Sequence, residues 1–115
     1  MVTSVTNLGR TGAFDWLMQR VSAVVLAVYT LFLAGYALAS PDLDYAQWAG
    51  LFDQLWMRIF SLLALILLGI HSWVGLWTIT TDYIKPAGPR FLAQACSGLL
   101  MFIYLVWGVE ILWGL

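Results

Sequence analysis

The sequence has very little charge. Asp, Glu, Lys and Arg together make up 10% of its 115 residues, and the formal net charge is −1. A soluble domain carries closer to a quarter charged residues, and a near-neutral chain gives no reason to expect a nucleic-acid partner. No polar segment is long enough to fold as a separate soluble domain. We therefore predict one membrane domain over residues 1–115.

Cysteine and histidine are equally scarce, with one of each, Cys96 and His71. A single thiol excludes an internal disulfide and any metal site built on a pair of cysteines. Cys96 lies in an apolar run, where a small buried side chain is the ordinary role of a free cysteine. His71 is therefore the one residue of the chain whose chemistry calls for a specific explanation.

Apolar residues are abundant and gather in three uncharged runs, at 21–41, 59–81 and 91–109. Each run is long enough to cross a bilayer as a helix. We predict an all-α membrane protein with three transmembrane helices, at about 17–39, 58–81 and 90–113. The stretches 42–57 and 82–90 are predicted to be short polar connections, and Pro86 and Pro89 to separate the second helix from the third.

The basic residues predict the orientation of these helices. Most of them lie at the N-terminus and in the second connection: Arg10, Arg20, Lys85 and Arg90. The first connection is acidic and is bordered only by Arg58. The positive-inside rule therefore places the N-terminus in the cytoplasm and the C-terminus on the opposite side of the membrane.

The N-terminal region allows a rival interpretation as a signal peptide, because residues 37–39 (Ala-Leu-Ala) resemble a cleavage site. The first apolar run is longer than the usual core of a signal peptide, so we expect it to be retained as a helix. Before it, the polar stretch 7–20 contains Phe14 and Trp16. These aromatic residues indicate a segment lying at the membrane interface.

His71 lies near the middle of the second apolar run, about 18 Å from one end and about 15 Å from the other in a helix. An ionisable side chain at that depth is expensive and usually has a function. Imidazole there suits a proton relay, a buried hydrogen bond or an iron ligand. Gly75, one turn further, leaves space for a planar macrocycle. A histidine simply packed between helices is the alternative.

If His71 binds haem iron, a second axial histidine must come from another polypeptide, because this chain has no other. Met18, Met57 and Met101 are the alternative ligands within the chain, although the first two lie near helix ends. Arg20 is then a candidate for the haem propionates, or else an ordinary cytoplasmic anchor of the first helix. Small residues recur at helical spacing in the first helix and predict close packing against a neighbouring helix. They are Ala23, Ala27, Thr30 and Ala34.

Tyr83 and Asp82 lie at the cytoplasmic end of the second helix, where Tyr83 is about 18 Å along the axis from His71. A phenol can donate a hydrogen bond to a carbonyl, and a neighbouring carboxylate can carry protons. These are the properties that a quinone site needs. An aromatic-belt tyrosine beside a helix-end aspartate is the structural alternative.

The segments HSWVGLW at 71–77 and TDYIKP at 81–86 resemble the haem and quinone region of the bacterial succinate dehydrogenase hydrophobic membrane anchor subunit. The start LGRTG at 8–12, with Asp15 and Arg20, and the ending Trp113-Gly114 are similar to that family as well. Some relatives carry histidine at the position of Phe14, and its absence here leaves any propionate contact to other groups.

This resemblance implies one of the two membrane anchors of respiratory complex II in the bacterial inner membrane, with a periplasmic C-terminus. The partners implied are a three-helix cytochrome b subunit, an iron–sulfur subunit and a flavoprotein subunit. His71 would be one axial ligand of a shared haem b, Tyr83 and Asp82 would form part of the ubiquinone site, and Arg20 would lie near the haem propionates. The chain would not be an enzyme on its own.

Three other functions are open at this point. A fumarate reductase anchor would run the same chemistry in reverse with menaquinone. A small multidrug transporter has about this length, but it needs a carboxylate inside an early spanning helix, and none of the three apolar runs contains one. A purely structural anchor would use His71 only for packing.

Overall fold

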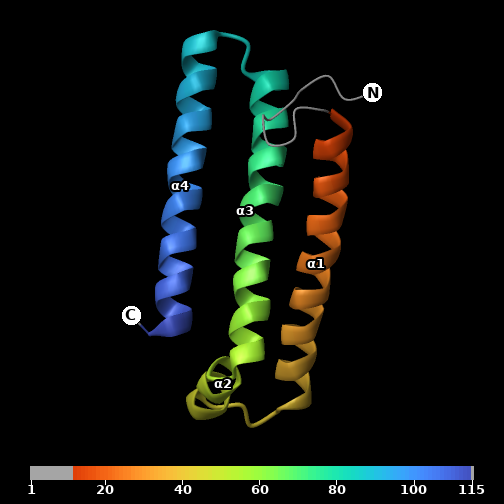
Figure 1. Cartoon of the computed structure of the whole chain (residues 1–115), viewed down its shortest axis with the longest axis vertical. Coiled ribbons are helices and arrows are strands. Elements are labelled where there is room, and N and C mark those ends of the chain that lie inside the picture. Colours follow the sequence, from red (N-terminus) through yellow and green to blue (C-terminus); the bar gives the residue numbers. More distant parts are fainter. Residues whose placement is uncertain (1–11, 115) are drawn as a thin grey trace.

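The computed structural model describes residues 12–114, which form three long helices and one short helix (Figure 1). The long helices are α1 (Gly12–Ala39), α3 (Leu55–Tyr83) and α4 (Ala87–Trp113), and the short one is α2 (Tyr45–Phe52). Each long helix measures about 40 Å, more than the ~30 Å hydrocarbon core of a bilayer. All three are apolar enough to cross a membrane, which confirms the predicted all-α class with three spans.

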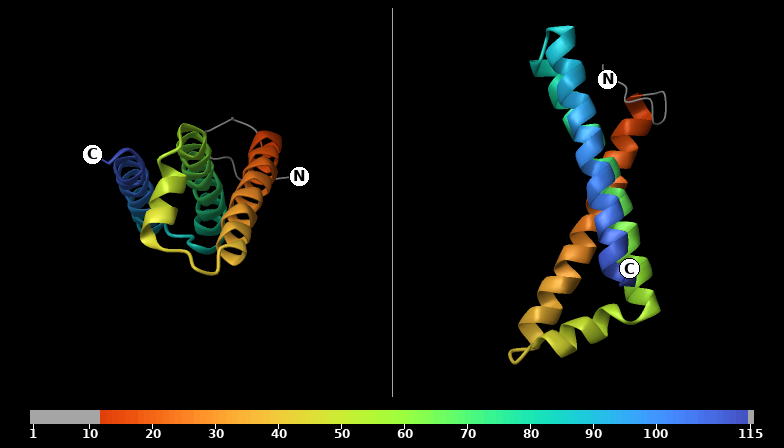
Figure 2. Two further views of the ribbon diagram at one scale, coloured as in Figure 1. Left: turned by 90° about the horizontal axis from the view of Figure 1, so that it is seen from below. Right: turned by 90° about the vertical axis from the view of Figure 1, so that its left-hand side faces the viewer.

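The central helix of the bundle is α3, which packs against α1 on one side and α4 on the other (Figures 1 and 2). The axis of α1 is inclined to those of α3 and α4, and α2 lies across one end of the bundle (Figure 2). The start of α1, the end of α3 and the start of α4 share the other end (Figure 1). That end carries Arg20, Lys85 and Arg90, the cations that predict a cytoplasmic location.

The connection predicted at 42–57 contains the helix α2, so the prediction of a simple polar loop is wrong. Asp44 caps this helix: its carboxylate accepts a hydrogen bond from the Gln47 N–H at 2.8 Å, and the Gln47 side chain accepts one from the Asp44 N–H at 3.4 Å. This reciprocal pair is a capping box. At the other end of α2, the Arg58 Nε donates to the Phe52 carbonyl at 2.9 Å and braces the corner with α3.

The first transmembrane helix begins earlier than predicted, at Gly12. Phe14 and Trp16 therefore belong to α1 itself, and their position at the membrane interface stays a prediction. The helix can include the polar residues of this stretch. Asp15 lies in its first turn, where the positive end of the helix dipole favours a carboxylate. Residues 1–11, which include Arg10, lie outside the described residues.

The turn between α3 and α4 follows the expected role of its prolines. α3 ends at Tyr83, and Pro86 is the N-cap of α4, with φ −62° and ψ 133°. Pro89 lies in the first turn of α4, where a backbone N–H has no partner within the helix and proline costs little. α4 therefore starts at Ala87, slightly before the predicted boundary.

Polar side chains join the long helices in pairs. The Tyr29 hydroxyl of α1 lies 2.7 Å from the Ser61 hydroxyl of α3, and the Gln94 Nε2 of α4 donates to the Thr80 hydroxyl of α3 at 2.9 Å. Such hydrogen bonds contribute about 0.6 to 2 kcal/mol each within a membrane. They hold α1 and α4 on opposite sides of α3.

Most apolar side chains point away from the bundle, as expected where the surroundings are lipid or another membrane subunit. The small-residue face of α1 (Ala23, Ala27, Thr30 and Ala34) is also exposed. These residues do not provide the contact between α1 and α3. The face is left open to whatever lies beside this chain in the membrane.

Candidate functional site

His71 lies on the side of α3 that faces α1, and its imidazole forms a hydrogen bond to that helix. The His71 Nδ1 is 3.0 Å from the hydroxyl of Ser22, which is fully buried. The Ser22 hydroxyl also donates to the Gln19 backbone carbonyl at 3.2 Å. The imidazole is therefore anchored to α1 through one ring nitrogen. Within the described residues the other nitrogen, Nε2, has no hydrogen-bond partner.

The Gln19 side chain lies next to Gly75, one turn of α3 beyond His71. A Cβ atom added at Gly75 would meet the Gln19 Nε2 at 3.4 Å, so the space predicted beside the imidazole is bordered by this amide. The Gln19 Oε1 is buried and accepts no hydrogen bond within the described part of the chain. A buried acceptor without a donor is costly, so this region is chemically incomplete in the chain by itself.

The ligand set around His71 limits which prosthetic groups fit. Among residues 12–114, no three His, Cys, Asp or Glu side chains gather to hold a metal ion. A single neutral imidazole instead suits a metal that brings its other ligands with it, as haem iron does. The anchored ring and its available Nε2 fit a haem held at the edge of this chain.

Arg20 is exposed on α1, with its guanidinium carbon 4.6 Å from the centre of the Trp16 ring. It lies two residues before Ser22, so the two side chains leave α1 in nearly opposite directions. The structure therefore does not bring Arg20 to the face where His71 meets Ser22. Its charge is presented to the surroundings of the bundle.

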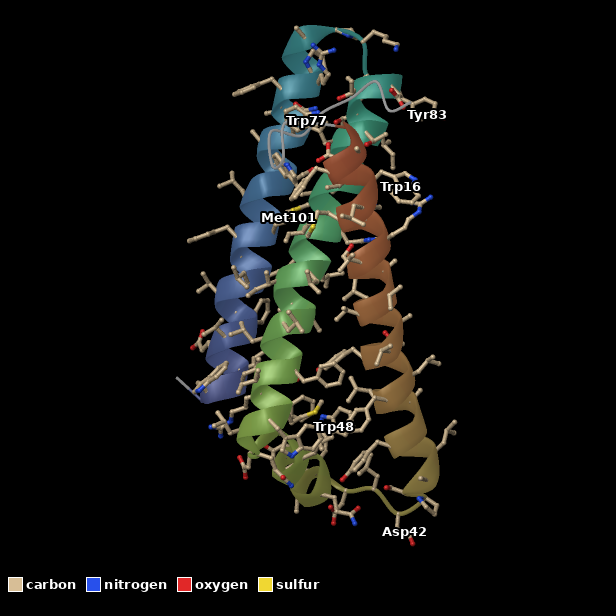
Figure 3. The ribbon with its side chains drawn as sticks, turned by 45° about the vertical axis from the view of Figure 1, so that its right-hand side comes forward. Trp16, Asp42, Trp48, Trp77, Tyr83 and Met101 are labelled. Atoms are coloured by element: carbon tan, nitrogen blue, oxygen red, sulfur yellow. The ribbon has the colours of Figure 1, made fainter. Side chains whose placement is uncertain are left out.

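Tyr83 is the last residue of α3, and its side chain points away from the bundle (Figure 3). It is 80% exposed, and its neighbour Asp82 is exposed as well. Neither side chain forms a hydrogen bond or an ion pair within the described residues. The two lie about 18 Å from His71 along the helix, at the end of the bundle.

A groove of about 1070 Å³ lies between α3 and α4 and is lined mainly by apolar side chains. Ser72 and Trp73 border it, whereas His71 does not. Since His71 faces α1, this groove is separate from the imidazole site and contains none of the candidate site residues.

Sequence reasoning missed the two α1 residues that contact the histidine region, Ser22 and Gln19. A signal was present: Asp15, Gln19 and Ser22 follow the spacing i, i+4, i+7, which places three polar residues on one face of a helix. Asp15 and Ser22 are both buried, with 3% and 0% exposure. This polar stripe is part of the face of α1 that packs against α3, in the N-terminal half of α1.

The fold and this geometry define a multi-pass membrane protein with a lone anchored histidine in its central span. Residues 3–90 match the model of the succinate dehydrogenase/fumarate reductase transmembrane subunit family. The succinate dehydrogenase hydrophobic membrane anchor subunit of Coxiella burnetii is 37% identical over 109 residues, covering 95% of each chain. The chain therefore belongs to this family of transmembrane subunits, in which it stands with the succinate dehydrogenase membrane anchors.

Proposed function

We propose that this chain pairs with a three-helix cytochrome b subunit in the bacterial inner membrane, where the two anchors hold one haem b and form a ubiquinone-reduction site. An iron–sulfur subunit, carrying the flavoprotein, docks at the end formed by the start of α1 and the turn after Tyr83. Electrons from succinate pass through iron–sulfur clusters to ubiquinone. The chain contributes ligands and surfaces but catalyses nothing alone. Its family and its 37% identical relative support this assignment.

The observation that carries the haem proposal is the state of His71. Its Nδ1 is held by Ser22, and its Nε2 has no partner within the described residues, which is the arrangement of a histidine prepared to bind a metal. Because the chain has no second histidine, the other axial ligand comes from the cytochrome b subunit. Haem b, when bound, supplies a one-electron acceptor inside the membrane.

The remaining residues of this chain orient that group. His71 fixes it against α3. Arg20 leaves α1 away from the His71–Ser22 contact, so its exposed guanidinium can bind a propionate only where the shared group extends past α1 toward the partner subunit. The open apolar surface of α1 is suited to the partner anchor.

The ubiquinone site is assigned to Tyr83 and Asp82. Ubiquinone is apolar and enters from the bilayer, whereas the two protons that it takes up come from water, so its headgroup must lie near the membrane surface. Tyr83 lies at such a depth with a hydroxyl free to donate to a quinone carbonyl. Asp82 is exposed next to it and can pass a proton from water toward that carbonyl.

The haem assignment is tested by replacing His71 with Tyr in the complex purified through this chain. We expect the absorption and electron paramagnetic resonance spectra of the haem to change, because a phenolate in place of an imidazole alters the ligand field. Tyr29→Phe serves as the control, since it changes another polar side chain between α1 and α3. Identical spectra for the wild-type and His71→Tyr complexes would remove His71 as the ligand.

A further inference from the structure

The Ser22 hydroxyl, which sequence reasoning overlooked, determines what the His71 ring can do. Ser22 has 0% exposure, so no water satisfies it. Its oxygen lies within hydrogen-bond distance of two groups, the Gln19 carbonyl at 3.2 Å and the His71 Nδ1 at 3.0 Å. A hydroxyl has one proton and can donate it to only one of them.

The direction of these hydrogen bonds is linked to the tautomer of His71. The Gln19 carbonyl can only accept, and a bond from the Ser22 hydroxyl to it is an ordinary bond from a serine to its own helix. When Ser22 donates there, its oxygen accepts from His71, which places the imidazole proton on Nδ1. In the neutral ring the lone pair is then on Nε2. The opposite direction would place the proton on Nε2 and prevent that atom from binding a metal.

We propose that Ser22 is a positioning residue that holds His71 as the Nδ1–H tautomer and aims Nε2 at the haem iron. This rests on the proposed function, in which His71 is an axial ligand. A hydrogen bond from Nδ1–H makes Nε2 a stronger electron donor. A stronger donor stabilises ferric iron more than ferrous iron, so Ser22 lowers the reduction potential of the haem.

The test is a redox titration of the haem in the purified complex carrying Ser22→Ala, compared with Ser22→Thr. Removing the hydroxyl should weaken the preference of the site for ferric iron about tenfold, the lower end of the effects seen when a partner of a metal-binding histidine is lost. For a one-electron couple this raises the midpoint potential by about 59 mV. Threonine keeps the hydroxyl and should retain the wild-type potential.

Ser61→Ala is the matched control. Ser61 is also buried between α3 and α1, with 3% exposure, and it is also hydrogen-bonded across the interface, to Tyr29. It lies about 15 Å along α3 from His71. Its replacement loosens the same pair of helices without touching the imidazole, so the haem potential should not move.

The role of Ser22 is overturned if the haem midpoint potential of Ser22→Ala equals that of the wild type. It is also overturned if Ser61→Ala shifts that potential by the same amount. Should the alanine variant fail to assemble, Ser22→Thr and Ser22→Val decide the question, because they share a shape and differ in the hydroxyl: equal potentials overturn the proposal. A complex without haem, or a haem indifferent to His71→Tyr, overturns the proposed function itself. A haem sensitive to His71 but not to Ser22 overturns only this inference.

Discussion

Replacing Tyr83 with Phe removes one oxygen atom from the proposed ubiquinone site and little else. The side chain is 80% exposed at the end of α3, and its hydroxyl bonds to nothing within the described residues. The phenylalanine ring has nearly the same shape, so the fold and the contacts of α3 should not change. Any effect on turnover therefore reports the hydroxyl itself.

The expected size of the effect follows from one hydrogen bond. A bond between the Tyr83 hydroxyl and a quinone carbonyl contributes about 0.5 to 1.5 kcal/mol net. Since 1.4 kcal/mol corresponds to a factor of ten, kcat/KM for ubiquinone should fall by about two- to tenfold. The quantity of assembled complex in the membrane should stay within the error of the wild type.

The assay is succinate-driven reduction of a short-chain ubiquinone analogue by the purified complex, measured over a range of quinone concentrations. Reduction of an artificial acceptor that takes electrons directly from the flavoprotein should be unchanged, because that step does not involve this chain. Tyr45→Phe is the matched control: Tyr45 is 84% exposed and belongs to α2, at the other end of the bundle.

Two results would refute this reasoning. Quinone kinetics of Tyr83→Phe that match the wild type would show that the hydroxyl does not contact the substrate. An equal fall in Tyr45→Phe would show that the effect is not specific to the end of the bundle that carries Tyr83.

We make three further predictions, two on the packing of α3 and one on the isolated chain. Tyr29→Phe removes the 2.7 Å bond to buried Ser61, so the chain should dissociate from the purified complex at a lower temperature, with a loss of about 1 kcal/mol; an unchanged temperature would mean that the bond is not stabilising. Gly108→Ala should change stability by less than about 1 kcal/mol, because the Leu65 methyl groups that a Cβ would meet end a flexible side chain bordering the groove, and a larger loss would mean that Leu65 cannot move aside. The chain expressed alone should be unstable, which a well-behaved, haem-free monomer in detergent would disprove.

The sequence allowed the three spans to be predicted because uncharged runs of this length have one stable form in lipid. It did not reveal α2, whose eight residues are too few for a periodic pattern and follow a stretch rich in aspartate. The Asp44–Gln47 spacing of a capping box was nevertheless readable. The start of α1 was placed too late, at about residue 17, because the stretch 7–20 before the first apolar run is polar, although α1 begins at Gly12.

The individual residues of the candidate site could be predicted from the sequence, but the contacts between them could not. His71 stands out by its chemistry and depth, and the 71–77 and 81–86 segments identify the family. The contact between Ser22 and His71 was not predictable, because it depends on how α1 and α3 pack, and the two residues are 49 positions apart in the sequence. The polar stripe that ends at Ser22 marks a face of α1 but does not say which helix it meets.

The central claim is that His71 is an axial ligand of a haem shared with a second anchor. Its most direct test is the amount of haem b per copy of this chain in the complex purified through a tag on it, measured from the reduced-minus-oxidised absorption spectrum. One haem b per chain, together with a co-purifying cytochrome b subunit, is the predicted result. A complete complex without a Soret band would contradict the claim and leave His71 as a side chain that only joins α3 to α1.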